Sequence, residues 1–220
     1  MALKKNLDML VFEKIRDRII ASEWKQGENL DVDELAHYYE VSRTPVLQAL
    51  KRMLSEGMLV VSGTGKYFFP KYTKEDVQNI CRVRRVLELE SLDELRNKPE
   101  NFRISALADT AQQCKKMTLC GNIIVSRQLD LLWHKNLIEL TGNDCLIHLY
   151  TQVQGQFMVA NYLQVFHSKE QQLIAADDHI NILEALERGD YDQAKEILIS
   201  HIDGAYEKIT ARTYDVPLDA

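Results

Sequence analysis

The segment VSRTPVLQALKRMLSEGMLV, residues 41–60, decides the N-terminal fold. Ser42 is a good N-cap for a helix, and Pro45 lies in its first turn, where backbone N–H groups have no partner inside the helix. Gly57 ends the segment's helical pattern. Between these two ends runs an apolar stripe at helical spacing: Val46, Leu50, Met53 and Leu54. The pattern therefore predicts a helix that begins after Ser42 and ends at Gly57.

Two further helices precede this segment, and a β-hairpin follows it. A first helix is indicated by apolar residues on one face: Leu10, Val11, Ile15, Ile19 and Ile20. Asp31 stands three residues before Glu34, a capping-box pattern that opens a short second helix through Tyr39. The β-prone runs Met58–Val61 and Tyr67–Phe69 flank a Gly-containing turn. Three helices and a hairpin predict a winged helix-turn-helix, whose third helix enters the major groove of DNA.

Residues 41–60 also resemble the signature of the GntR family of bacterial regulators, V-S-R-T-P-V-R-E-A-L-x-x-L-x-x-E-G-L. Upstream, Leu30, the run Glu34-Leu35-Ala36 and the turn at Gly27 fit the same family. The resemblance implies a sequence-specific transcription regulator that binds double-stranded operator DNA.

The chemistry of the third helix agrees with DNA binding. Ser42, Arg43 and Thr44 lie at its positive N-terminus, where amides, hydroxyls and a guanidinium can contact phosphates or base edges. Arg43 is the best candidate for a bidentate contact with guanine. The turn from Gly63 to Lys66 forms the predicted wing, which places Lys66 near a phosphate or the minor groove. Ser42 can instead act only as a cap, and Lys66 only as a solvated charge.

One dipeptide departs from the family pattern. After Pro-Val the family usually has Arg-Glu, whereas this chain has Leu47 and Gln48. The Arg is a frequent DNA contact in the family. Gln48 can still bind adenine, but Leu47 offers only an apolar contact, such as one to a thymine methyl group. The operator sequence therefore does not follow from the resemblance.

From Thr73 onward the pattern is helical, with about six helices and no credible strand, which predicts an all-α bundle. We expect a DNA-binding domain at residues 1–72 and a sensor and dimerisation domain at residues 73–220. The charge distribution supports the division: residues 1–72 carry 11 Lys and Arg against 10 Asp and Glu, net +1. The remainder carries 16 against 23, net −7, which together give the overall −6.

The helical part contains a possible set of metal ligands. Asp130 and His134 are four residues apart, so they share one helix face and can bind one ion together. His179 and His201 are far enough apart to lie on two consecutive antiparallel helices, and a bundle lets all four side chains converge. Each histidine can instead be an ordinary packed core residue. The other histidines have no such spacing: His37, His148 and His167.

These residues lie in a pattern that resembles the FCD sensor domain of the FadR-type branch of the GntR family. The matching segments are Asp-x-x-x-His at residue 130, Asp178-His179 and ILEALERGDYDQAKEILISHI at residues 182–202, with Arg84-x-x-Leu-Glu88 at the domain start. Members with one Asp and three His hold a divalent metal, so the resemblance implies one here. The donor set suits Zn²⁺, Ni²⁺ or Mn²⁺ and does not choose among them.

An octahedral ion with four protein ligands leaves two positions, which a small carboxylate effector can take. Arg84 can neutralise that carboxylate as a bidentate partner, or it can simply pair with Glu88 on its own helix. The predicted function is a homodimeric repressor whose DNA affinity changes when a small organic acid binds at the metal. The alternatives are a metal sensor with no organic effector and a metal-dependent hydrolase, although the sequence offers no general base or HExxH motif for the latter.

The composition of the chain limits which other classes of protein are possible. The chain of 220 residues has 45% hydrophobic and 27% charged residues, which fits two ordinary globular domains. It contains no run of about 18 apolar residues and no apolar signal core at its start, so we expect a cytoplasmic protein without a membrane span. The four cysteines form no CxxC pair, which favours reduced thiols over a zinc ribbon. A net charge of −6 argues against a protein that coats nucleic acid non-specifically.

Overall fold

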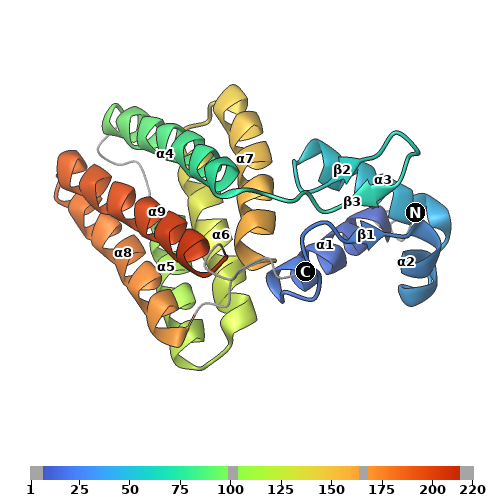
Figure 1. Ribbon diagram of the computed structural model, residues 1–220. Coiled ribbons are helices and arrows are strands. Elements are labelled where there is room, and N and C mark those ends of the chain that lie inside the picture. Colours follow the sequence, from blue (N-terminus) through green and yellow to red (C-terminus); the bar gives the residue numbers. More distant parts are fainter. Residues whose placement is uncertain (1–6, 99–103, 164–167, 214–220) are drawn as a thin grey trace, which may run out of the picture. The chain divides into compact units, whose positions relative to one another are not determined.

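A computed structural model describes residues 7–98, 104–163 and 168–213 (Figure 1). The chain divides into two compact units, one formed by residues 1–73 and 152–164 and the other by residues 74–151 and 165–220. The expected boundary between residues 72 and 73 stays a prediction. His167 lies outside the described residues.

The first unit is the expected winged helix-turn-helix. Its elements, in chain order, are α1 (Leu7–Ile20), β1 (Asn29–Leu30), α2 (Val32–Tyr38), α3 (Arg43–Ser55), β2 (Val60–Val61) and β3 (Tyr67–Phe68). The hairpin of β2 and β3 is confirmed, with Val61 opposite Tyr67. The sequence did not reveal β1, which pairs with β3 so that Leu30 faces Tyr67. Two residues are too few to show the alternation by which a strand is recognised.

The core of this unit lies between α1 and α3. Ile15, Val46 and Leu50 are fully buried there, in agreement with the apolar stripes of the sequence. One member of the predicted first stripe is wrong: Leu10 is 44% exposed, and Phe12 at 3% takes the buried position. Leu10 lies outside the interior face of α1, which is centred on Ile15 and Ile19. Phe12, the residue after Val11, completes that face.

The second unit is all-helical within the described residues, which confirms the predicted fold class. Its helices are α4 (Lys74–Arg96), α5 (Ser105–Leu119), α6 (Ile123–Glu139), the first part of α7 (Asp144–Tyr162), α8 (Lys169–Glu187) and α9 (Tyr191–Thr213). The residues of α7 from Gln152 onward belong to the first unit. α5 packs against α6 and α8, and α9 packs against α4 and α8. Short turns join α5 to α6, α6 to α7 and α8 to α9, the last at Gly189, whose φ of 74° suits a glycine. No described helix is long and apolar enough to cross a membrane.

The interior of this bundle is partly polar. Trp133 and Leu137 form an ordinary apolar layer, with each side chain fully buried. Beside them lie ionisable residues that are almost completely excluded from solvent: Arg84, Glu88, His134 and His179. Buried charges are costly unless they are paired or bind a metal, so this cluster marks the candidate site.

Candidate metal centre

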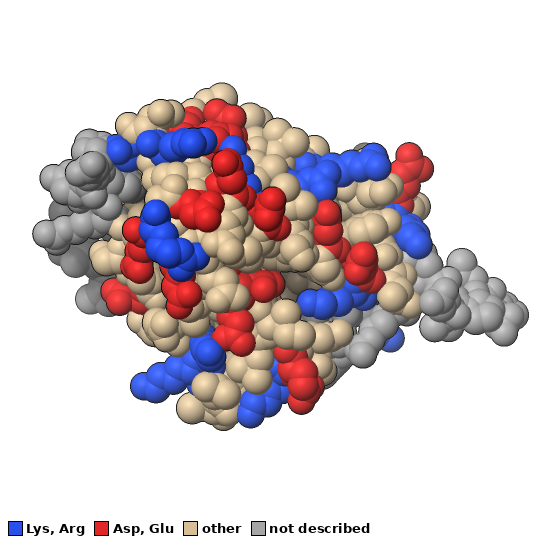
Figure 2. All heavy atoms as spheres, turned by 90° about the vertical axis from the view of Figure 1, so that its left-hand side faces the viewer, with Lys and Arg blue, Asp and Glu red and all other residues tan. Residues whose placement is uncertain are grey.

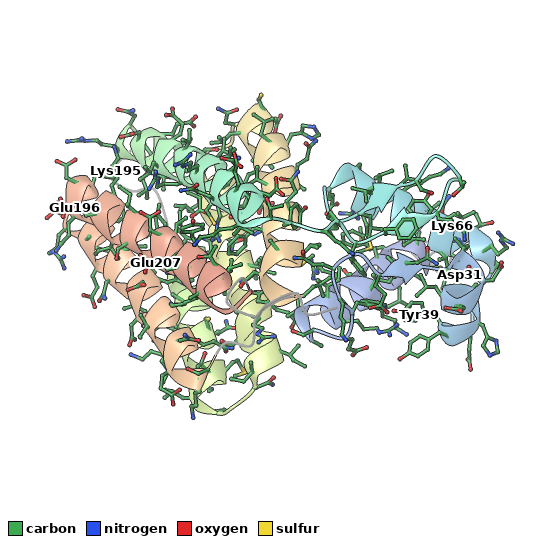
Figure 3. The ribbon with its side chains drawn as sticks, viewed as in Figure 1. Asp31, Tyr39, Lys66, Lys195, Glu196 and Glu207 are labelled. Carbon is green, nitrogen blue, oxygen red and sulfur yellow. The ribbon has the colours of Figure 1, made fainter. Side chains whose placement is uncertain are left out.

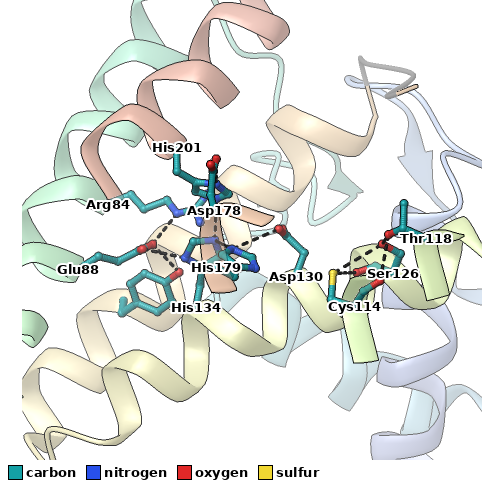
Figure 4. A network of polar contacts seen from close by, with 11 residues as sticks. Arg84, Glu88, Cys114, Thr118, Ser126, Asp130, His134, Asp178, His179 and His201 are labelled. Carbon is teal, nitrogen blue, oxygen red and sulfur yellow. Dashed lines mark hydrogen bonds and ion pairs between the residues drawn. The ribbon is translucent and has the colours of Figure 1, made fainter. Parts of the chain in front are cut away.

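Four predicted ligands meet in the interior of the second unit (Figure 4). α6 supplies Asp130 and His134, α8 supplies His179, and α9 supplies His201. Their ligand atoms all lie within 4.8 Å of one another. The structure therefore brings together every residue of the predicted set, although they are spread over 72 positions of the chain, 130 to 201.

Two of the histidines are held in one tautomer by carboxylates. His134 Nδ1 lies 2.7 Å from Glu88 Oε2, and His201 Nδ1 lies 3.2 Å from Asp178 Oδ2. A carboxylate can only accept, so each Nδ1 carries the proton and donates it. Each Nε2 is then left with a lone pair directed into the cluster. Carboxylates that orient histidines in this way commonly surround protein metal sites.

The lone pairs of His134 and His201 face each other at close range, and Nε2 of His179 lies beside them. His134 Nε2 lies 3.1 Å from His201 Nε2, and His179 Nε2 lies 3.1 Å from His134 Nε2. Asp130 Oδ1 lies 3.7 Å from His179 Nε2. Two lone pairs at this separation repel unless a cation lies between them. The donor set, its orientation and its burial therefore fit a divalent metal ion.

His179 is positioned by packing instead of by a carboxylate. Its ring stacks on the indole of Trp133, with centroids 4.0 Å apart and planes inclined by 10°. Its Nδ1 is buried and has no hydrogen-bond partner among the described residues. This nitrogen destabilises the folded protein, because a buried N–H without an acceptor costs free energy.

Burial keeps two of the histidines in the protonation state that a metal requires. It lowers the pKa of His134 and of His179 well below the ordinary value, because an imidazolium would lose its hydration. The positive charge of Arg84 lowers both further. For Asp130 burial acts the other way: it raises the pKa and so disfavours the carboxylate, while the positive charge of Arg84 opposes this shift. Neutral imidazoles are the form that binds metal.

Arg84 lies in a buried network beside the cluster. Its Nε donates to Glu88 Oε1 at 2.6 Å, and Tyr150 donates its hydroxyl to the same oxygen at 3.0 Å. The pairing with Glu88 that the sequence left open is thus present. This pairing uses the Nε atom of Arg84. The charge of the guanidinium still lowers the pKa of Asp130 and of His134. Arg84 as an effector contact stays a prediction.

Sequence reasoning did not find the residues that support the ligands. Glu88 was visible only as the helical neighbour of Arg84, and Asp178 only as part of a family motif. Glu88 and His134 are 46 positions apart, so no local spacing links them. Trp133 and Tyr150 resemble ordinary core aromatics. The available signal was a carboxylate, Glu88, at helical spacing in a stripe that also contains Ile80 and Leu92.

The predicted DNA-contacting residues lie together on the surface of the first unit. Ser42, Arg43, Thr44 and Gln48 are exposed on α3, and Gly63 and Lys66 are exposed in the wing. Ser42 makes no side-chain capping bond, so its hydroxyl is available for another partner. Arg43 pairs with Asp33 at 3.1 Å, and both side chains are well exposed. The histidines outside the metal set, His37 and His148, are exposed too.

Asp31 lies close enough to residues of both α3 and the wing to be affected by their charges. Amides of α2 hold the pKa of its carboxyl below the ordinary value as they cap the helix, and the charges of Arg43 and Lys66 lower it further. Figure 3 shows Asp31 and Lys66 in this unit. On the face drawn in Figure 2, Lys and Arg side chains are interspersed with those of Asp and Glu. The DNA contacts themselves stay predictions.

Comparison with known proteins agrees with both units. Residues 9–67 match the model of the bacterial regulatory proteins of the gntR family, and residues 79–204, more than half of the chain, match the FCD domain. The chain belongs to the GntR family, in the group that carries an FCD domain. A regulator from an unstable DNA locus of Streptomyces ambofaciens is 24% identical, over 90% of this chain and 83% of that protein.

Two further comparisons cover almost the whole chain. A putative L-lactate dehydrogenase operon regulatory protein of Escherichia coli is 24% identical, over 97% of this chain and 89% of that protein. The solved structure of McbR/YncC of E. coli has the same fold, with a TM-score of 0.79 at 18% identity over 94% of this chain and 98% of that one. This GntR-family chain is therefore a DNA-binding transcription regulator and not an enzyme, so the hydrolase alternative is wrong.

Proposed function

We propose that this regulator is a homodimeric, cytoplasmic repressor whose DNA affinity is changed by a small carboxylate bound at a divalent metal. Asp130, His134, His179 and His201 hold the metal. The observation that carries the proposal is the pair of carboxylate-oriented imidazoles, His134 and His201, whose Nε2 atoms meet at 3.1 Å. A divalent cation bound by both nitrogens removes the repulsion between their lone pairs.

The separation of the two nitrogens is compatible with a six-coordinate ion. With metal–nitrogen bonds of about 2.1 Å, nitrogens 3.1 Å apart would subtend about 95° at the metal. Four protein ligands on an octahedral ion would leave two positions for a carboxylate, and Zn²⁺, Ni²⁺ and Mn²⁺ all remain candidates.

The buried guanidinium of Arg84 favours an anionic effector. Arg84 is buried beside the ligands, and its charge disfavours the protonation of His134 and His179. A divalent ion adds two further positive charges, and the carboxylates of Asp130, Glu88 and Asp178 together balance the ion and Arg84. A carboxylate effector completes the coordination, and Arg84 provides its hydrogen-bonding partner. The name of one relative refers to an operon for L-lactate, a small hydroxy acid, so L-lactate is a suitable first probe.

α4 provides a route from this site to the DNA-binding unit along the chain. The helix begins at Lys74, six residues after the last residue of β3, and carries both Arg84 and Glu88. An effector can change DNA affinity only if it binds one arrangement of the protein more tightly than the other. A small displacement of α4 when Arg84 contacts a carboxylate is the change we propose. Two wings and two α3 helices in a dimer then contact a two-fold operator.

The test combines metal analysis with DNA titration. Operator DNA is selected from a random pool, and its affinity is measured with the purified protein, with chelator, and with acetate or L-lactate. We expect stoichiometric metal, and an acid-dependent change in DNA affinity that disappears with the metal. If chelation alone switches DNA binding and no acid matters, the protein is a metal sensor. A protein that binds no divalent metal contradicts the proposal.

A further inference from the structure

Gln172 is a buried polar residue with no function in the metal centre. It lies on α8 and is 9% exposed. Its amide oxygen and its amide nitrogen are both buried, and neither has a hydrogen-bond partner among the described residues. A buried amide without partners costs about 1–3 kcal/mol, and such groups are rare in native proteins. An apolar residue would be more stable here, so the amide indicates a bound polar group.

Gln172 lies on the same interior stripe as a metal ligand. The buried residues of α8 include Gln172, Ala176 and His179, at intervals of four and three, so one helix face carries them all. Gln172 thus lies two turns before His179. α6 repeats the pattern: Arg127 is 5% exposed and lies two turns before His134, with Asp130 between them.

The packing of α5 places these two residues in one layer of the bundle. α5 runs antiparallel to α8, because Lys115 pairs with Asp177 and the carbonyl of Leu119 accepts from Lys169. It also runs antiparallel to α6, because Ser126 of α6 contacts Thr118 while Asn136, farther along α6, donates to Thr110 near the start of α5. The contacts of Ser126 are with Cys114 and with Thr118 (Figure 4).

α6 and α8 are therefore parallel to each other. The positions along α5 that each of them contacts show which of their residues lie at the same level. Thr118, one of the two α5 residues that contact Ser126, lies between Lys115, which pairs with Asp177, and Leu119, which accepts from Lys169. Arg127 and Gln172 thus lie at the same level, two turns from the metal ligands on their respective helices. Together they bring a buried positive charge and an unpartnered amide to one end of the metal centre.

We propose that Arg127 and Gln172 form a second polar subsite, which binds the far end of an effector whose near carboxylate is on the metal. This inference rests on the proposed effector function. Two helical turns are about 10.5 Å. Subtracting about 2 Å for a metal–oxygen bond and about 3 Å for a hydrogen bond leaves roughly 5–6 Å between the two end groups. The effector is a dicarboxylate of about four to six carbons, whose second carboxylate pairs with Arg127 and accepts from Gln172.

The test compares acids of different length on the metal-loaded protein. Binding of acetate, succinate, glutarate and adipate is measured by calorimetry for the wild type, for Gln172→Leu and for Gln113→Leu, a control at an exposed glutamine of α5. We expect at least one dicarboxylate to bind tenfold or more tighter than acetate to the wild type. Gln172→Leu should lose about tenfold for that dicarboxylate while its acetate affinity and metal content stay unchanged. The control should match the wild type.

A second measurement separates a ligand subsite from a structural glutamine. Without ligand, Gln172→Leu should melt at a higher temperature than the wild type, because it removes an unpartnered amide from the interior. A lower melting temperature shows that the amide is satisfied in the free protein and overturns the subsite. Equal dicarboxylate binding by wild type and Gln172→Leu also overturns it and leaves the proposed function intact. If no acid binds the metal-loaded wild type, the effector function itself fails, and this inference fails with it.

Discussion

His134→Ala should remove most of the stabilisation that the metal gives to this protein. His134 is fully buried, and its Nε2 is in contact with Nε2 of both other histidines. It is thus the central member of the set. At a free metal concentration 1,000 times the Kd, binding stabilises the folded state by about 4.1 kcal/mol. If the variant binds a hundredfold more weakly, the same metal concentration gives only about 1.4 kcal/mol.

The difference, about 2.7 kcal/mol, corresponds to roughly 5–11 °C in a domain of this size. The substitution has a second effect that does not involve metal. Glu88 Oε2 loses the donor that lies 2.7 Å away, and a buried carboxylate with a missing partner is destabilising. The metal-free variant should therefore also melt below the metal-free wild type. Only the difference in melting temperature between chelated and metal-loaded samples isolates the role of His134 as a metal ligand.

The assay is thermal unfolding with chelator and with added metal, alongside metal analysis and DNA titration. His148→Ala, at an exposed histidine of α7, is the matched control and should keep the full increment. His134→Ala should bind operator DNA at close to the original strength without effector and lose the response to acids. A variant that retains stoichiometric metal and the full thermal increment would refute the ligand assignment. A variant that loses its metal but still responds fully to an acid would show that the metal does not hold the effector.

Three more predictions concern the DNA surface and the histidine cluster. Arg43→Ala should weaken operator binding by about 1–3 kcal/mol and relax base preference at one position per half-site; an equal loss on random DNA would reduce Arg43 to a phosphate contact. Leu47→Arg should tighten DNA binding and steepen its salt dependence, and an unchanged salt slope would mean that position 47 does not face DNA. In the metal-free protein, the free energy of unfolding should fall as the pH drops below 6.5, the ordinary pKa of histidine, because the unfolded chain takes up protons that buried His134 and His179 do not. Urea unfolding at several pH values checks this, and a pH-independent midpoint across that range would contradict it.

The sequence by itself determined the elements and their order. Ser42, Pro45 and the stripe from Val46 to Met53 predicted α3, and the structure places that helix at Arg43–Ser55. The hairpin, the all-helical second unit and the four-residue spacing of Asp130 and His134 were likewise available, because local backbone preferences and helix periodicity act over a few residues. The short strand β1 and the exposure of Leu10 were missed for the same reason, since each depends on what packs against it.

Only the tertiary structure decided how the distant polar residues meet. Glu88 binds His134 from another helix, Asp178 orients His201, and Trp133 stacks on His179. No periodicity predicts such pairs, because their partners are set by how helices cross in the bundle and by the requirement that buried charges be paired. The amide of Gln172 is the clearest case. In the sequence it is one more glutamine near a helix start, and only its burial without a partner, two turns from a metal ligand, distinguishes it from a solvated side chain.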